Sequence, residues 1–370
     1  YYSNRDFVGL LPFTNGGYVE LNRDFSGVEI SIKDKSQNFE WIVGTSIQDQ
    51  KDDRKRFENN EGEKGAITLD QIESFRSYGA FALASYNKEN YSIQSGVRFD
   101  IHEISLDDNV GIDQQYVEYS KSLKAFSPNV GFIYNLNKND EVYINYGKSY
   151  ETPSLSELSA NPNGVGFNGD LNPMNSSGFD LGFRNKSQNL SYSITAFYIK
   201  TKDEIVRYEL EGFEGMNFYR NLGTSKRIGT EMEVSYNLGN SGVLNASYTQ
   251  AKYEFKNQEV SGDLPGIPKS NFALKWLYGY KDFDLKLDLK YVNSLYADNS
   301  NQVKVPSYLL SNIALKNKFN FKGFFLEVGL HVRNLLDEKY YDNIRTNAFG
   351  NRFYEPASLR SFILSIKTAF

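Results

Sequence analysis

The fold is decided by the stretch Phe324-Phe325-Leu326-Glu327-Val328-Gly329-Leu330-His331-Val332-Arg333. Its residues alternate in kind, because the even positions are all apolar while the odd ones include Glu327, His331 and Arg333. A period of two predicts a β-strand with one apolar face and one largely polar face. A second strand of this kind ends the chain, and its apolar face carries Phe362, Leu364, Ile366, Thr368 and Phe370.

The same alternation recurs along the chain. In residues 283–291 the odd positions are Phe, Leu, Leu, Leu and Tyr, and the even positions are Asp, Lys, Asp and Lys. Four charges on one face of a strand are costly in a dry core, whereas a water-filled or plugged interior tolerates them. A strand that ends on an aromatic residue is unusual for a soluble protein, whose termini are normally solvated. These features predict an all-β fold, a transmembrane antiparallel β-barrel.

The composition excludes several other classes of protein. The chain of 370 residues has no cysteine, 15% aromatic residues and a mean hydropathy of -0.54. It lacks an apolar run of the roughly 18 residues that a transmembrane helix needs. Without cysteine there is no disulfide scaffold and no thiolate metal site. A net charge of -5 argues against nonspecific binding to nucleic acid, and we expect no nucleic-acid partner.

Short polar turns and long polar connections alternate along the chain. The short turns are predicted at 35–38, 87–90, 137–140, 185–189, 239–242, 280–282 and 320–323. The long connections are predicted at 12–24, 49–72, 105–123, 150–176, 207–222, 254–268, 294–306 and 337–352. Together they delimit about sixteen strands, with long loops outside the cell and short turns in the periplasm. Two acidic pairs, Asp52-Asp53 and Asp107-Asp108, are expected to be solvated in these loops, where carboxylates could also bridge lipopolysaccharide through calcium.

Three motifs, in this order along the chain, resemble segments of TonB-dependent outer-membrane receptors. The first is Tyr146-Gly147-Lys148-Ser149-Tyr150-Glu151-Thr152-Pro153-Ser154-Leu155-Ser156-Glu157-Leu158, leading to Gly169-Asp170-Leu171-Asn172-Pro173. The second is Asn221-Leu222-Gly223-Thr224-Ser225-Lys226-Arg227-Ile228-Gly229-Thr230-Glu231, where Gly229 is expected to allow close packing. The third joins Val332-Arg333-Asn334-Leu335-Leu336-Asp337 to Tyr354-Glu355-Pro356-Ala357 and the terminal Phe370.

The resemblance implies a receptor in the outer membrane of a Gram-negative bacterium. Such receptors have a barrel of about 22 strands closed by a plug. Residues 1–370 would be the C-terminal portion of this barrel, with the N-terminal plug and about six strands outside the chain. Partners would be the TonB-ExbB-ExbD complex, reached through the absent N-terminal segment, and lipopolysaccharide and outer-membrane lipid. The family branch most similar in its loops includes the receptor for pyrroloquinoline quinone, and a ferric siderophore is the competing ligand.

Arginine and aromatic side chains in the long connections are the candidate ligand-binding residues. Guanidinium groups and aromatic faces suit an anionic quinone or ferric chelate. The candidates in or beside these connections are Arg207, Tyr208, Tyr219, Arg345, Phe349, Arg352 and Tyr354. Arg98, Arg184 and Arg333 fall on polar strand faces, where we expect structural salt bridges.

The two histidines, His102 and His331, fall on polar strand faces by alternation. Either could bind a ligand, as an axial ligand of haem iron or by a hydrogen bond, but a place in a polar network is the simpler interpretation. Neither has a distinctive Ser or Asp partner, so we expect no catalytic site and no enzyme. Gly164, Gly166 and Gly169 lack the strand, helix and Lys-Ser/Thr of a phosphate loop. No cofactor and no metal site are expected.

Two other classes of protein fit part of the pattern. A complete sixteen-stranded porin would pass small solutes passively, but porins carry no counterpart of the three motifs. A soluble β-rich binding protein would share the polar strand faces, and solubility without detergent would support it. The motifs therefore favour a receptor that imports a scarce nutrient with energy supplied through TonB.

Overall fold

The structure is a computed structural model that describes residues 1–109, 117–163, 166–213, 216–256 and 261–369. The chain folds into two compact units. Unit 1 contains Tyr1–Phe132, Asn145–Gly178 and Thr201–Thr224, and unit 2 contains Ile133–Ile144, Phe179–Lys200 and Ser225–Phe370. Among the described residues, no helix has the length and apolar character needed to cross a membrane.

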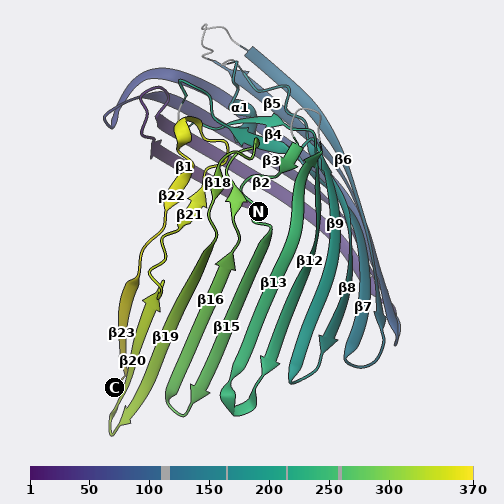
Figure 1. The fold of residues 1–370 in the computed structure, drawn as a ribbon. Helices are drawn as coiled ribbons and strands as arrows, with labels where there is room; N and C mark the ends of the chain where they lie inside the picture. Colours follow the sequence, from purple (N-terminus) through teal and green to yellow (C-terminus); the bar gives the residue numbers. More distant parts are fainter. Residues whose placement is uncertain (110–116, 164–165, 214–215, 257–260, 370) are drawn as a thin grey trace. The chain divides into compact units, whose positions relative to one another are not determined.

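Almost every element is a β-strand (Figure 1). The first elements are β1 (Tyr2–Leu10), β2 (Tyr18–Lys35), β3 (Phe39–Asn60), β4 (Glu63–Asn87), β5 (Tyr91–Asp108), β6 (Val117–Asn135), β7 (Asp140–Glu151), α1 (Leu155–Ser159), β8 (Met174–Lys186), β9 (Leu190–Lys202), β10 (Ile205–Tyr208) and β11 (Phe218–Asn221). The next are β12 (Thr224–Asn237), the 3-10 turn η1 (Gly239–Ser241), β13 (Val243–Lys256), β14 (Ser261–Asp263), β15 (Ser270–Tyr280), β16 (Phe283–Val292), β17 (Leu295–Tyr296) and β18 (Lys304–Val305). The last are β19 (Tyr308–Phe321), β20 (Phe324–Arg333), β21 (Tyr341–Ile344), η2 (Phe349–Asn351), β22 (Tyr354–Pro356) and β23 (Ser361–Ala369).

The predicted number of strands is confirmed. In the described part of the chain, sixteen strands have nine or more residues and the other seven have four or fewer. Each predicted short turn lies between two consecutive long strands. In unit 1, β1 to β5 pair antiparallel in chain order. In unit 2, the antiparallel order is β12, β13, β15, β16, β19, β20 and β23.

The deciding stretch forms β20, which pairs with β19 on one side and β23 on the other. Its apolar residues align with those of β23, since Val332 lies opposite Phe362 and Leu330 opposite Leu364. This shared apolar face is open, because Phe362 and Leu364 keep 67% and 65% of their surface exposed. Alternation therefore placed the two faces correctly, while the terminal Phe370 lies outside the described residues.

The prediction of a long connection at 49–72 is wrong. These residues form the outer halves of β3 and β4, a hairpin closed by the two-residue turn Glu61-Gly62. Both turn residues have positive φ, 57° and 100°, which suits a tight hairpin. The charged run reads as a loop in the sequence, but its side chains pair with neighbouring strands. The predicted connection at 12–24 is also shorter, because β2 already begins at Tyr18.

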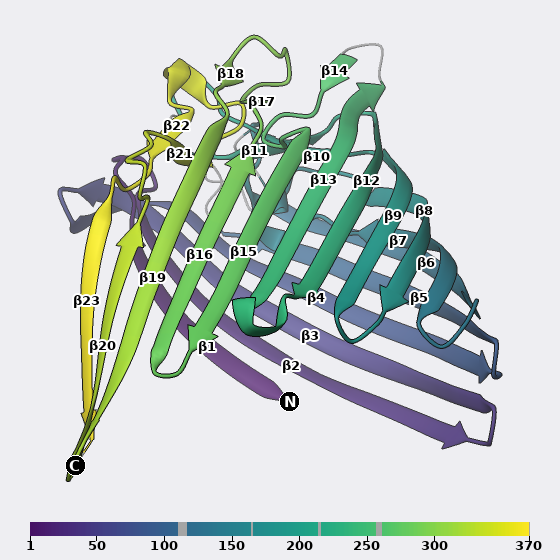
Figure 2. The same ribbon diagram turned by 60° about the horizontal axis from the view of Figure 1, so that its bottom comes forward.

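The other long connections carry short elements of their own. In unit 2, β17 pairs with β18 and β21 with β22, at the opposite end of the long strands from the short turns (Figure 2). In unit 1, α1 and the β10–β11 hairpin occupy the connections at 150–176 and 207–222. Part of the connection at 105–123 lies outside the described residues, and β5 extends into it as far as Asp108.

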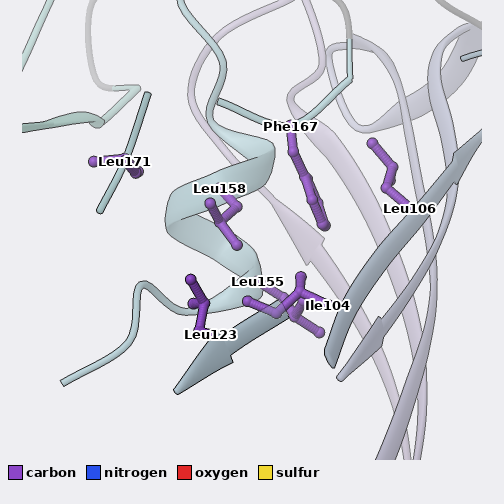
Figure 3. Close-up of a cluster of buried hydrophobic side chains, with 7 residues drawn as sticks. All are labelled: Ile104, Leu106, Leu123, Leu155, Leu158, Phe167 and Leu171. Atoms are coloured by element: carbon purple, nitrogen blue, oxygen red, sulfur yellow. The ribbon is translucent and has the colours of Figure 1, made fainter. Parts of the chain in front are cut away.

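Each unit has an apolar cluster under its long connections. The cluster of unit 1 lies around α1 (Figure 3) and contains Ile104, Leu106, Leu123, Leu155, Leu158, Phe167 and Leu171. The cluster of unit 2 contains Ala297, Val305, Ala348 and Phe353. Because these clusters bury apolar residues of the connections, they fix loops that would otherwise be free to move.

Close packing at Gly229 is confirmed and gives a testable prediction. A Cβ on Gly229 would lie 2.4 Å from the Cβ of Ala251 and 2.5 Å from the carbonyl oxygen of Gln250. We expect Gly229→Ala to lower the free energy of unfolding in detergent by about 1–3 kcal/mol, as overpacking does. Gly147→Ala is the control, since its Cβ would meet nothing nearer than 4.0 Å. Equal losses in both variants would contradict the close approach of β12 and β13.

Candidate ligand-binding surfaces

The first motif builds a short helix that covers the wall of unit 1. Ser154 caps α1: its hydroxyl accepts from the Glu157 backbone N–H, and the Glu157 carboxylate accepts from the Ser154 N–H. This capping box fixes the helix entry. Leu155 and Leu158 then point into the apolar cluster with Ile104 (Figure 3). The connection at 150–176 is therefore a packed segment of unit 1.

Asn221 joins the first two motifs inside unit 1. Its side-chain oxygen accepts from the backbone N–H of Asn172 at 2.6 Å, and its amide donates to the carbonyl of Asn172 at 2.8 Å. The same amide donates to the carbonyl of Asp203 at 2.7 Å. One side chain therefore ties the end of the connection at 150–176 to both ends of the β10–β11 hairpin.

Replacing Asn221 tests this role. In Asn221→Ala the backbone of Asn172 loses both partners, so we expect its amide to exchange with solvent at least about tenfold faster, an effect of roughly 1.4 kcal/mol. Hydrogen exchange followed by mass spectrometry on the peptide around Asn172 measures this. Asn343→Ala is the control, because the side chain of Asn343 donates to Glu355, in unit 2. An unchanged exchange rate at the Asn172 amide would contradict this role of Asn221.

Three of the predicted ligand-binding residues meet in the β10–β11 hairpin of unit 1. Arg207 and Tyr219 lie directly opposite each other across the two strands. Tyr208 faces Phe218 with ring centroids 6.0 Å apart, and the guanidinium of Arg220 lies 5.3 Å from the Tyr208 ring. Burial raises the pKa of the half-buried Tyr219, and the charge of Glu157 adds to the effect while Arg207 opposes it. The hairpin thus presents arginines beside aromatic rings, as expected for binding an anionic ligand.

His102 lies elsewhere in unit 1, in an aromatic stack. Its ring is 5.3 Å from that of Phe75 and 6.2 Å from that of Tyr150, both nearly parallel to it. Its Nδ1 atom is buried and makes no hydrogen bond with the residues described. Within the described ranges no group of three His, Asp or Glu side chains is placed to hold a metal ion. Phe75 and Tyr150 thus flank the ring of His102, and the charges of Asp100 and Arg98 lie near enough to act on it.

The remaining candidates of the long connections lie in unit 2. Tyr354 stacks on Tyr341 with ring centroids 4.4 Å apart. The Arg345 N–H donates to the carbonyl of Phe353 at 2.9 Å, and Arg352 Nε donates to the carbonyl of Phe349 at 3.3 Å. Phe349 and Tyr354 each keep 37% of their surface exposed. The η2 turn therefore holds its arginines and aromatic rings in one fixed segment.

His331 lines a separate groove of unit 2, of about 600 Å³, together with Lys286, Asn312, Arg333 and Tyr340.

The expected salt bridges on polar faces are confirmed for two arginines. Arg98 contacts Asp100 at 2.7 Å, and Arg184 contacts Glu141 at 2.8 Å.

A buried charge cluster on β2, β3 and β4 of unit 1 was missed in the sequence. Arg54 Nε lies 2.8 Å from Glu73 Oε1, and Arg23 forms two hydrogen bonds to Asp52, at 2.8 and 2.6 Å. The expectation that Asp52 is solvated is wrong, since Asp52 and Glu73 are 0% exposed. Asp108 is also buried. Its carboxylate accepts hydrogen bonds from the side-chain amide of Gln71 and from the backbone N–H of Gly166.

This cluster lies beyond the span that a membrane covers. Strands need roughly 9–11 residues to cross a bilayer. β3 and β4 have 22 and 25 residues, which is more than a crossing needs. If the crossing residues are counted from the short turns at 35–38 and 87–90, the parts of β3 and β4 that carry the charge cluster lie outside the membrane. Burial raises the pKa of Glu73 to about 7, while the charge and hydrogen bond of Arg54 oppose the shift. Glu73 therefore titrates near neutral pH.

The comparisons with known proteins agree with this geometry. The family model described as "TonB dependent receptor-like, beta-barrel" matches residues 1–335. The catecholate siderophore receptor Fiu of Escherichia coli (strain K12) is 25% identical over 264 residues, which are 69% of this chain and 34% of that protein. The ferrioxamine receptor of Yersinia enterocolitica is 23% identical, over 58% of this chain and 30% of that protein.

The fold is shared with solved receptor structures. The unliganded ferric citrate transporter FecA superposes with a TM-score of 0.77 at 17% identity, covering 99% of this chain and 57% of that one. The chain spans about a third of the curated relatives cited above and about half of the solved structure. From residue 1 to residue 335 this chain belongs to the TonB dependent receptor-like β-barrel family, so it is a transmembrane β-barrel of the Gram-negative outer membrane.

Proposed function

We propose that this chain is the barrel part of a receptor that binds a ferric chelate and imports it with energy supplied through TonB. The family match over residues 1–335 carries the proposal. The relatives named for catecholate siderophores and ferrioxamine support a ferric chelate as the ligand class. The arginine–aromatic surfaces of the β10–β11 hairpin and of the η2 turn supply suitable chemistry, because guanidinium groups pair with anionic oxygens and rings with ligand faces.

Pyrroloquinoline quinone is the competing ligand. It is a tricarboxylate, so the same arginines would suit it. The relatives described above are named for ferric chelates, and this favours the chelate over the quinone. The same family membership favours a receptor over a passive porin.

The proposal extends from this chain to the intact receptor. We propose that residues 1–370 are the C-terminal portion of the barrel, and that the intact protein includes a plug and the segment that contacts the TonB-ExbB-ExbD complex. The coverage of about a third of the curated relatives supports this arrangement. Lipopolysaccharide and outer-membrane lipid are the proposed surroundings of the barrel.

Binding to the full-length receptor in detergent tests the ligand class. Quenching of intrinsic fluorescence is measured with ferric catecholate, ferrioxamine, ferric citrate and pyrroloquinoline quinone. We expect at least one ferric chelate to bind, and Arg207→Gln or Arg352→Gln to weaken it at least about tenfold, the loss of one charged hydrogen bond. Lys281→Gln, at the short turn between β15 and β16, is the control. Binding of the quinone alone would overturn the chelate assignment, and binding of none would overturn the receptor function.

A further inference from the structure

The β12–β13 hairpin of unit 2 has an exposed apolar face that ends in lysines. On β12, Ile228 and Met232 lie on this face and keep 54% and 39% of their surface exposed. On β13, Tyr248 lies opposite Met232 and is 39% exposed. Lys226 comes next after Ile228 on the same face, and Lys252 lies directly opposite Ile228. The surface of the hairpin therefore changes from apolar to cationic along its strands.

The lysines begin at the depth where the strands leave the membrane. A transmembrane strand crosses the bilayer with roughly 9–11 residues. Counted from the short turn at 239–242, a crossing of about ten residues reaches Ile228 on β12 and Lys252 on β13. The short turns of an outer-membrane barrel face the periplasm, so the other end of the hairpin, which pairs with β14, faces the outer leaflet (Figure 2). Lys226 and Lys252 thus lie level with lipid headgroups rather than with acyl chains.

Cations outnumber carboxylates at this end of the hairpin. The described residues of this lysine cluster are four lysines and two carboxylates: Lys226, Lys252, Lys256, Lys269, Glu254 and Asp263. Glu254 pairs with Lys252 and Lys256, and Asp263 pairs with Lys269 at 2.8 Å. Lys226 makes no ion pair with any residue that the structure describes, although it lies opposite Glu254. The paired lysine side chains keep 48–60% of their surface exposed, so an external anion can reach them. Two positive charges are thus in surplus here, in a chain whose net charge is -5.

We propose that the lysine cluster binds the phosphate groups of lipopolysaccharide. The inference rests on the proposed function, which surrounds the barrel with this lipid, and it gives the lipid a specific contact site. Lysine ammonium groups are compact charges that suit phosphate oxygens. Ile228, Met232 and Tyr248 continue the same face toward the periplasm, where they contact the acyl chains of the lipid. The hairpin thus presents charge and apolar surface in the order in which lipopolysaccharide presents its phosphates and its acyl chains.

The test titrates the full-length receptor in detergent with lipid A, the phosphorylated anchor of lipopolysaccharide, and with lipid A whose phosphates have been removed. Native mass spectrometry measures the bound lipid. EDTA is present, so that binding reports the lysines and not a divalent ion held between carboxylates and phosphates. We expect the wild type to bind the phosphorylated form at least about tenfold more tightly than the other form. Combining Lys226→Gln with Lys252→Gln should remove at least about tenfold of this affinity, because each lysine at an anionic membrane surface contributes roughly fivefold.

Lys275→Gln combined with Lys290→Gln is the matched control, because these two exposed lysines of unit 2 lie on the opposite, polar face of β15 and β16. Its affinity for lipid A should stay that of the wild type. Equal losses in the two double variants would overturn the site. An unchanged affinity of the Lys226–Lys252 variant, or equally tight binding of the two forms of lipid A to the wild type, would also overturn it. Failure of every ferric chelate to bind, with the lipid A affinity lost as expected, would overturn the receptor function and leave the lipid site intact.

Discussion

At pH 8, above the pKa of about 7 that burial gives Glu73, Arg54→Ala is expected to lower the free energy of unfolding by about 3–5 kcal/mol, the usual cost of removing one partner of a buried ion pair. Glu73 is fully buried and has Arg54 2.8 Å away, so the substitution leaves a carboxylate in a dry site without its cation. Asp52 loses its more distant contact with the same arginine. Urea unfolding of the full-length receptor in detergent, followed by tryptophan fluorescence, measures the loss, and Trp41 lies on the same strand, β3.

The matched control is Arg76→Ala, on the same hairpin. Arg76 contacts Asp49 at the same distance of 2.8 Å, but the two side chains keep 53% and 46% of their surface exposed. An exposed pair of this kind contributes about 0–1 kcal/mol. Equal losses in the two variants would show that burial of the Arg54–Glu73 pair contributes nothing.

The pH dependence of stability is the second large expected effect. The pKa of Glu73 rises from 4.5 to about 7 on folding, mainly through burial. Between these values the folded state keeps a proton that the unfolded state has released. Stability should therefore fall as the pH rises from about 4.5 to about 7, by at most about 1.4 kcal/mol per pH unit, and change little above that window.

Glu73→Gln isolates this contribution, because glutamine keeps the shape and cannot ionise. Other carboxylates act in the opposite direction. The pKa of Asp140, for example, is lowered by hydrogen bonds from Asn137 and Asn185, so its contribution is lost at low pH. The relevant quantity is thus the difference in unfolding free energy between wild type and Glu73→Gln, measured from pH 4 to pH 8. A difference that does not vary with pH would contradict a buried, neutral Glu73.

Alternation predicted the strands well because each strand's two faces meet different surroundings. Val332 and Phe362 align on one exposed apolar face, and the polar face of β16 carries its charges where Lys286 pairs with Asp288. The outer part of the β3–β4 hairpin escaped prediction because its run of charges resembles a loop. Those charges are satisfied by residues on other strands, as Asp52 is by Arg23, and a local pattern does not contain such partners.

The grouping of the candidate residues follows from the sequence only in part. Arg207 and Tyr219 were singled out by type and position, and the structure makes them direct neighbours across β10 and β11. The role of Asn221 depends on a contact with Asn172, 49 residues earlier. Such a contact cannot be derived from a single sequence. The helix α1 could have been predicted, because Ser154 and Glu157 have the spacing of a capping box.

Uptake of radiolabelled iron tests the central claim most directly. Cells that lack their own ferric chelate receptors would express the full-length protein, with and without a functional TonB, and would be offered ferric catecholate, ferrioxamine and ferric citrate. We predict uptake of at least one chelate that saturates with concentration and stops when TonB is absent. Uptake that continues without TonB and rises linearly with concentration would contradict the receptor function and would identify a passive pore.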